Sequence, residues 1–359
     1  MRSFPVLTDP TYQKPEKYSA FDKFWLSKMR DERDLPFVHL TFRLMAIFFP
    51  MAILLYLPIP FLLRLAIAVV YTFLNVFRYK SRFTLMLHCT SHRPWFKTKH
   101  KTLNLFLPWI LGPFMGQSPE AYFCHHIGMH HLEGNMEDDD SSTMHYQRDS
   151  KLDFAKYLLR FLFFGLFTLT AYFNKKNRPQ LRNRAIFGEL VFYTLIIALS
   201  FINFWATLVV FILPFITTRI TMMLGNWAQH SFVCVEDPSN EYKNSITCVN
   251  AIYNKRCWND GYHISHHVKP TLHWTEHPNH LLENKDEYAK NKALVFDEMH
   301  FGLIWLLLMK KDYERLASHV VNINDTFSSK EEIIELLKSR TQKIPESIKI
   351  YTNGERVYV

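Results

Sequence analysis

Two long apolar blocks, at residues 40–77 and 187–224, limit what this chain can fold into. Each is almost twice as long as the ~20 residues that cross the hydrocarbon core of a bilayer. The first block carries a turn signal, Pro-Ile-Pro, at residues 58–60, and a weaker turn is expected at 203–206 in the second. We therefore expect two helical hairpins in a membrane, although the second block also fits one long helix kinked near Pro214.

The apolar segment 153–173 is ambiguous. It carries Lys156 and Arg160, and an arginine near the middle of a bilayer costs at least ~2.5 kcal/mol. If the segment lies in the membrane interface as an amphipathic helix, the chain crosses the bilayer four times. If it crosses, block 187–224 is a single crossing. We favour the interfacial arrangement, because the positive-inside rule places on the cytoplasmic face the basic loop that follows, formed by Lys175, Lys176, Arg178, Arg182 and Arg184.

The composition is typical of a membrane protein with large aqueous parts. Of 359 residues, 48% are hydrophobic and 21% are charged, and the formal net charge is +9. The positive charge forms no basic stripe with interleaved aromatic residues, so nucleic acid is not an expected partner. The five cysteines form no CxxC pair, which indicates a reducing compartment. The polar segment 1–35 has no signal-peptide pattern, and we expect a multi-pass protein of the endoplasmic reticulum.

Nine of the 18 histidines are concentrated in four short motifs. Residues three or four apart project from one face of a helix, so each motif can direct its side chains into one cavity. In the favoured topology all four motifs lie on the cytosolic side of the membrane. The motif residues are His88 and His92; His126, His130 and His131; Asn226 and His230; and His263, His266 and His267.

The number of imidazoles indicates two metal ions. Neutral imidazole is a good ligand for iron, zinc and copper, and nine imidazoles exceed what one ion needs. A pair of nitrogen-bound irons with open positions is suited to activating oxygen. One HxxxH motif alone is weak evidence, whereas the set of four is specific. A metal transporter would carry polar residues within its spans, but the apolar blocks hold few charges. A zinc hydrolase would carry an HExxH motif, and the sequence contains none.

The motif order HxxxH, HxxxHH, NxxxH, HxxHH resembles the membrane fatty acid desaturase/hydroxylase superfamily, which includes alkane monooxygenases. The resemblance covers about residues 40–278. It implies two iron ions that use O2 and two electrons to desaturate or hydroxylate a lipid chain. It also implies that the nine motif histidines are iron ligands, that Asn226 acts directly or through a water, and that no catalytic residue is needed beyond the metal ligands.

The second motif departs from the pattern of acyl-CoA desaturases, which have HxxHH where this chain has HxxxHH at 126–131. This departure favours the alkane-hydroxylase branch. The family resemblance as a whole implies desaturation of an acyl chain of a fatty acid or lipid as the expected reaction, with hydroxylation in the manner of alkane monooxygenases as the alternative. The sequence contains no GxGxxG and no His-Pro-Gly-Gly haem segment. Electrons are expected from an external donor, cytochrome b5 or a ferredoxin- or rubredoxin-like carrier, that docks on the basic cytosolic face.

Four residues near the motifs are expected to support the ligands rather than to bind metal. Glu133 stands out because it lies three residues after His130, just before the acidic run 138–140. Three later histidines, at 273, 277 and 280, are expected to be exposed, with a role as extra metal ligands as the alternative. The four supporting candidates are Glu133, His125, Trp274 and Glu276.

The expected fold is all-α: about four transmembrane helices in two hairpins, with a cytosolic helical cap that bears the histidine motifs. We divide the chain into a polar N-terminal segment (1–39), a desaturase-like membrane di-iron domain (40–280) and a C-terminal cytosolic helical tail (281–359). In the tail, a capping box that starts at Ser329 predicts a helix over 331–340. The apolar run 301–308 is too short to span and is expected to be interfacial or re-entrant.

Overall fold

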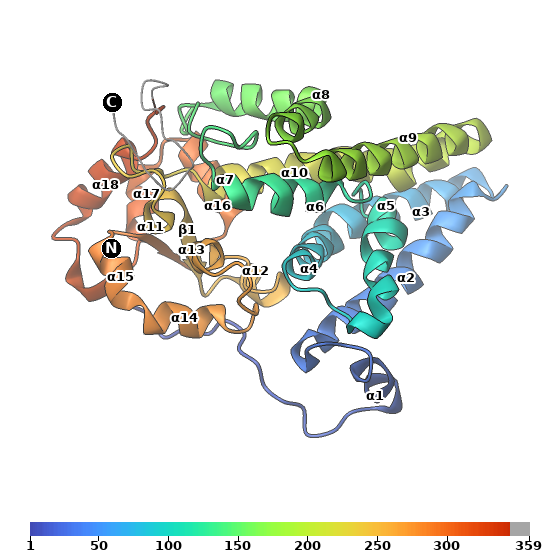
Figure 1. Ribbon diagram of the computed structural model, residues 1–359, viewed down its shortest axis with the longest axis horizontal. Helices are drawn as coiled ribbons and strands as arrows, with labels where there is room; N and C mark the ends of the chain where they lie inside the picture. The colour runs from blue at the N-terminus through green and yellow to red at the C-terminus, as the bar shows by residue number, and fades with distance from the viewer. Residues whose placement is uncertain (345–359) are drawn as a thin grey trace. The chain divides into compact units, whose positions relative to one another are not determined.

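The computed structural model describes residues 1–344, and nearly all of its regular structure is helical (Figure 1). The predicted all-α class is confirmed. Contacts divide the chain into two units. Among the described residues, unit 1 consists of residues 1–11, 128–172 and 222–344, and unit 2 consists of residues 12–127 and 173–221.

The first hairpin, in unit 2, is formed by α2 (Leu35–Tyr56) and α3 (Phe61–Phe73). They are joined by the expected proline turn, and Arg64 donates a hydrogen bond to the carbonyl of Leu57 in that turn. A π-helical turn (Leu74–Tyr79) then leads from α3 into α4 (Lys80–His92), which carries the first histidine motif.

The second apolar block is formed by α9 (Pro179–Thr207), a π-helical turn (Leu208–Ile212) and α10 (Leu213–Gln229). Within α9, Asn203 leaves the helical conformation, with φ −158° and ψ 97°. Its Oδ1 accepts a hydrogen bond from the backbone N–H of Ala206 at 3.1 Å, as the N-cap of a new helix does.

Contacts across this break show that the chain folds back. Arg219 pairs with Glu189 at 2.5 Å, and the ring of Phe215 packs on that of Phe192 at 5.0 Å. In one continuous helix, Arg219 and Glu189 would be about 45 Å apart. The hairpin predicted at 203–206 is therefore confirmed, and the single kinked helix is excluded.

Unit 2 also contains short helices, and one of them, α6, leads into the second histidine motif. Gly188 lets α9 pass close to the segment before α6, since a Cβ at this position would lie 1.7 Å from the carbonyl oxygen of Pro119. This approach holds α6 against α9. The short helices are α1 (Ala20–Leu26), 3-10 helices at Glu32–Asp34 and Thr98–Leu105, a π turn at Leu107–Leu111, α5 (Gly112–Phe114) and α6 (Ala121–His125).

Within the described residues, four helical stretches are long and apolar enough to cross a membrane: Glu32–Tyr56, Phe61–His92, Lys151–Lys175 and Pro179–Gln229. The last of these contains the hairpin break at Asn203. The chain is thus a membrane protein with several candidate spans.

Among its described residues, unit 1 combines mostly short helices and the long helix α8 with one two-stranded parallel sheet. Strand β1 (Ile246–Val249) pairs with β2 (Leu294–Asp297), with Ile246 opposite Leu294. Its helices, apart from the end of α10, are α7 (His131–Glu133), α8 (Lys151–Lys175), α11 (Glu241–Asn244), α12 (Ile252–Arg256), α13 (His263–Val268), α14 (His277–Glu283), α15 (Lys285–Lys290), α16 (Phe301–Met309), α17 (Tyr313–Ser318), a 3-10 turn (Ile323–Asp325) and α18 (Lys330–Ser339).

The C-terminal helices pack into the core of unit 1. In α16, Ile304 and Leu308 are fully buried in the same hydrophobic cluster as Trp227, so the expectation that 301–308 is interfacial or re-entrant is wrong. An apolar helix of this length is typical of a protein core. Ile333 and Leu337 of α18 join the same cluster. This helix begins as the capping box predicts, because Ser329 Oγ accepts the N–H of Glu332 at 3.2 Å. The boundaries predicted at 39/40 and 280/281 stay predictions.

Candidate metal centre

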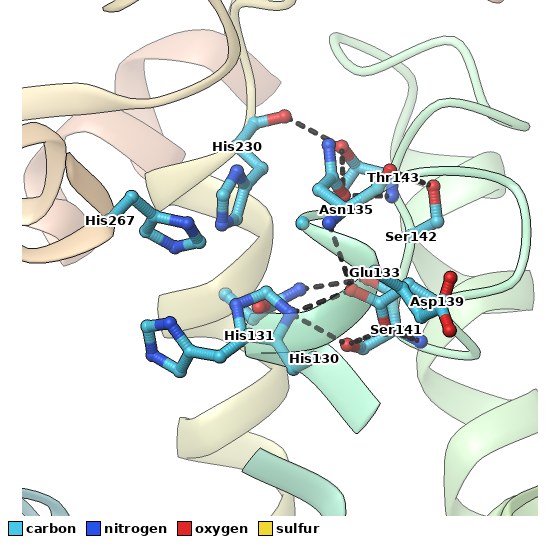
Figure 2. Close-up of polar contacts among 12 residues, drawn as sticks. His130, His131, Glu133, Asn135, Asp139, Ser141, Ser142, Thr143, His230 and His267 are labelled. Atoms are coloured by element: carbon cyan, nitrogen blue, oxygen red, sulfur yellow. Dashed lines mark hydrogen bonds and ion pairs between the residues drawn. The ribbon is translucent and has the colours of Figure 1, made fainter. Parts of the chain in front are cut away.

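Four buried histidines of unit 1 converge on one point: His130, His230, His263 and His267. Their candidate ligand atoms all lie within 4.8 Å of one another. The Nε2 atom of His263 is 3.1 Å from the Nε2 atoms of both His230 and His267. Figure 2 shows three of these rings, His130, His230 and His267, beside the loop that supports them. We call these four residues the histidine quartet.

Local sequence explains how the quartet forms. His263 and His267 are four residues apart on α13, so their rings project from the same face of that helix. His230 directly follows the last residue of α10. His130 ends the π-helical turn His126–His130. The four rings of the quartet therefore come from three separate segments of the chain and lie close together.

A buried aspartate orients the ring of His130. Nδ1 of His130 donates to Oδ2 of Asp139 at 2.7 Å (Figure 2). Asp139 is held in turn by the backbone N–H groups of Asn135, at 3.1 Å, and Ser141, at 2.8 Å. With Nδ1 bonded to the carboxylate, the lone pair of His130 Nε2 is left to face the quartet.

Acceptors also lie at Nδ1 of two other quartet members. Nδ1 of His230 donates to the backbone carbonyl of Asn244 at 3.0 Å, and Asn244 is fixed by a hydrogen bond from Asn135 Nδ2 at 2.8 Å. Glu241 Oε2 lies 3.1 Å from Nδ1 of His267. Acceptors at the far nitrogen are what metal-binding histidines usually have, because they fix the tautomer and the ring orientation.

The electrostatics of the quartet fit a cation. Burial, and then the neighbouring imidazoles, lower the pKa of His230 and of His263 well below the ordinary value. Both rings are therefore neutral near pH 7, the form that binds metal. Lone pairs on nitrogen atoms only 3.1 Å apart repel each other unless a proton or a cation lies between them. Such a spacing suits neighbouring ligands of one ion with bonds of about 2.1 Å.

The other five motif histidines form two groups. In unit 2, His92 and His126 approach with their Nε2 atoms 3.1 Å apart, and the ring of His88 lies 4.5 Å from that of His126. In unit 1, His131 and His266 approach at 2.9 Å between Nε2 atoms. Every motif histidine therefore has another motif histidine beside it within its own unit.

Asn226 and Glu133 have other partners. The amide nitrogen of Asn226 donates to the carbonyl of Ser141 at 2.9 Å and to the hydroxyl of Tyr157 at 2.8 Å. The buried carboxylate of Glu133 accepts from the hydroxyl of Tyr172 at 2.6 Å. The roles expected of Asn226 at the metals and of Glu133 behind a ligand remain predictions.

The remaining supporting candidates lie outside the quartet. His125 ends α6 in unit 2. The ring of Trp274 packs on that of Trp258 at 5.4 Å, and Glu276 is the N-cap residue of α14. Their expected roles stay predictions.

The later histidines differ from expectation, because His273, His277 and His280 are all buried. His277 Nδ1 is 2.7 Å from the hydroxyl of Ser265, which lies on α13 between two motif histidines. The expectation that these residues are exposed is wrong.

Sequence reasoning missed two of the residues that orient the quartet. The acidic run 138–140 was noted, and Asp139 belongs to it, but Asn244 and Glu241 belong to no motif. They lie on α11, more than ten residues after His230, and only the fold brings them to the rings. The one local signal is the polar run 239–245.

Comparison with known proteins agrees with this site. The family model described as fatty acid desaturase matches residues 63–298, about two thirds of the chain, and this stretch contains all four histidine motifs. No curated protein and no solved structure matches the chain significantly. Because the family match covers well over half of the chain and the motif histidines cluster as metal ligands do, the protein belongs to the fatty acid desaturase family.

Proposed function

We propose that the protein is a membrane-bound di-iron oxidoreductase that uses O2 and two electrons to desaturate an acyl chain of a fatty acid or lipid. The observation that carries the proposal is the histidine quartet, a buried set of nitrogen donors with hydrogen-bond acceptors behind its rings. Family membership supports an oxidoreductase of the desaturase/hydroxylase type.

The quartet would hold one iron, and His88, His92 and His126 would contribute to the second. For His131, His266 and Asn226 the assignment to iron rests on the motifs. Bound iron supplies the oxidation of a C–H bond by O2. The chain's own contribution is to orient three of the quartet rings through Asp139, Asn244 and Glu241 and to keep water from the buried donors.

Hydroxylation is the second candidate, and the spacing HxxxHH favours it. The extra residue falls in a π-helical turn over His126–His130. A π turn closes over five residues instead of four, and such turns are frequent at functional sites. The extra residue of the longer motif is therefore accommodated by a defined backbone conformation. The spacing HxxxHH also resembles the alkane monooxygenase pattern.

Contacts of α8 support an interfacial position for that helix. Arg160 pairs with Asp140 at 2.8 Å, and Thr168 also bonds to Asp140. If α8 crossed the bilayer, it would draw this acidic run into hydrocarbon. Phe163 and Phe167 of the same helix are exposed, as expected of residues that enter lipid.

This topology keeps the basic loop after α8 cytosolic, with the catalytic face on the cytosolic side of the endoplasmic reticulum. An acidic electron carrier, cytochrome b5 or a ferredoxin- or rubredoxin-like protein, would dock there. Replacing Lys175, Lys176 and Arg178 with Gln should slow turnover with the physiological carrier and leave turnover with a small chemical reductant unchanged. Unchanged turnover with both donors would refute this docking site.

The decisive experiment compares lipid profiles by mass spectrometry. Cells that express the parent chain, His263→Ala or the control His145→Ala are supplied with an electron carrier. A product two mass units lighter, made by the parent and by the control only, supports desaturation; one sixteen units heavier supports hydroxylation. If His263→Ala retains both the product and the iron, measured by plasma mass spectrometry, the di-iron proposal is wrong.

A further inference from the structure

Unit 2 has an apolar cavity of about 120 Å³ beside the start of α2. Its walls come from α1, from the first turns of α2 and from the segment 95–106. An apolar cavity of roughly 150 Å³ holds a benzene molecule, so this one has room for a few methylene groups. Its wall residues include Trp25, Val38, Phe42, Trp95, Phe96 and Leu103.

Backbone pairing holds these walls in place. The N–H of Arg30 donates to the carbonyl of Trp95 at 3.0 Å, and the N–H of Lys97 donates to the carbonyl of Lys28 at 2.9 Å. Trp25 packs on Phe42, with ring centroids 5.5 Å apart. The cavity is therefore framed by aromatic rings on a fixed backbone.

The same pairing gathers basic side chains at this place. Lys28 and Lys97 are joined by a backbone hydrogen bond, and Lys99 lies two residues after Lys97. Desolvation and then the charges of Lys28, Lys99 and Lys97 lower the pKa of His100, so these charges share one neighbourhood. Arg30, whose guanidinium donates to the carbonyl of Phe96, adds to them. We call Lys28, Lys97 and Lys99 the lysine cluster.

Carboxylates do not neutralise the lysine cluster. Across residues 1–344, none of its three lysines forms an ion pair with an acidic side chain. Asp31, the acidic residue next to this segment, pairs with Arg93 and Arg33, each at 2.7 Å. A surplus of positive charge is therefore left beside the cavity, which favours an anionic ligand.

The cavity also lies where a membrane lipid is present. Val38 and Phe42 lie in the N-terminal half of the candidate span Glu32–Tyr56. The cavity is therefore near one end of that span. Phe21 and Phe24 of α1 are exposed beside it, and aromatic residues are enriched at membrane interfaces. Basic side chains at this depth attract anionic lipid head groups.

We propose that this place binds an anionic phospholipid of the surrounding membrane. Part of one acyl chain occupies the cavity, and the phosphate lies over the lysine cluster. The assignment depends on both features. A soluble phosphate has no acyl chain to fill the cavity, and a zwitterionic lipid has no net negative charge to balance the lysine cluster. The site is independent of the proposed oxidation chemistry.

Brominated lipids test the proposal, because bromine quenches tryptophan fluorescence at short range and Trp25 and Trp95 line the cavity. The full-length protein is reconstituted in nanodiscs of phosphatidylcholine that contain a small fraction of brominated phosphatidylglycerol or brominated phosphatidylcholine. We expect at least twofold stronger quenching by the anionic lipid. The variant Lys28→Gln/Lys97→Gln/Lys99→Gln should lose this preference, whereas the control Lys255→Gln/Lys285→Gln/Lys290→Gln should keep it.

Three outcomes would overturn the proposal: equal quenching by the two lipids in the parent protein, a preference that survives in the lysine-cluster variant, or relief of quenching by a soluble acyl thioester or by inorganic phosphate. The last outcome would assign the site to a soluble ligand. Met45→Phe, which narrows the cavity and leaves the lysines in place, should reduce co-purified phosphatidylglycerol in native mass spectrometry by severalfold. An unchanged amount would contradict the role of the cavity.

Discussion

Arg148 is fully buried and should be essential for the quartet, although it touches none of the four rings. Its guanidinium donates to backbone carbonyls from one nearby segment and two distant ones. Nε bonds Ser231 at 3.1 Å, Nη1 bonds Thr143 at 3.2 Å, and Nη2 bonds Arg340 at 3.0 Å and Gln342 at 2.5 Å. Burial lowers the pKa of Arg148 to about 9, so the group is still charged near pH 7.

Two of these segments bear directly on His230. Ser231 is the next residue in the chain, and Thr143 donates its hydroxyl hydrogen to the carbonyl of His230 at 2.6 Å. Arg148 therefore ties the C-terminal segment around Arg340 to the backbone that places a proposed ligand. Loss of the guanidinium should loosen His230 and the tail together.

The expected loss follows from the bonds. Arg148→Met removes several charge-assisted hydrogen bonds, each worth about 1.5–3 kcal/mol, and leaves carbonyls unsatisfied. The substitution also removes the desolvation penalty of the buried charge, which amounts to several kcal/mol. Removing one partner from a buried charged network costs about 3–5 kcal/mol in total. For a chain of 359 residues, that loss corresponds to a fall in melting temperature of about 4–7 °C.

Thermal unfolding in detergent and iron content by plasma mass spectrometry are the assays. Arg148→Lys should be at least as harmful as Arg148→Met, because it keeps the buried charge and has fewer donors in the wrong geometry. The exposed Arg315→Met is the control. The reasoning is refuted if Arg148→Met melts within 2 °C of the parent, on the order of 1 kcal/mol, and retains its iron, or if Arg148→Lys restores both.

Three further predictions concern the same unit. Asp139→Asn should weaken iron affinity about 10–100-fold by removing the carboxylate behind His130; equal affinity in a chelator competition would contradict this. His267→Ala should lower bound iron, whereas His145→Ala should not, as metal analysis of purified protein will show. Burial raises the pKa of Asp260 to about 7, so the native state keeps a proton that the unfolded chain releases near pH 4, and stability falls as pH rises between these values. Asp260→Asn should therefore raise the melting temperature more at pH 8 than at pH 5, and an equal gain at both would count against a raised pKa.

Turns were predictable from the sequence where a residue type dictates them. The prolines at 58 and 60 stop a helix by themselves, so the first hairpin was clear. The second turn has neither Pro nor Gly, and its signal is Asn203, a good N-cap residue that bonds the N–H of Ala206. The helix Phe301–Met309 was misjudged because a short apolar run looks the same in a core and at an interface.

Partners of the ligands were harder to predict than the ligands. Helical spacing alone brings His263 and His267 together. Asn244 and Glu241 reach His230 and His267 only after the chain has left α10 and folded back through α11. Such contacts depend on tertiary structure and produce no periodic pattern in the sequence. Asp139 was easier to predict, because it lies only nine residues from His130 in the chain.

The two histidine doublets carry the strongest sequence evidence for two metals. Adjacent residues on a helix point about 100° apart, so the rings of a doublet cannot share one centre. The structure divides each doublet accordingly: His130 and His267 join the quartet, whereas His131 and His266 approach each other at 2.9 Å. A single metal ion would bind only one ring of each doublet. The motif therefore encodes two groups of ligands before any fold is known, and the loss of one group by mutation should leave the other able to bind metal.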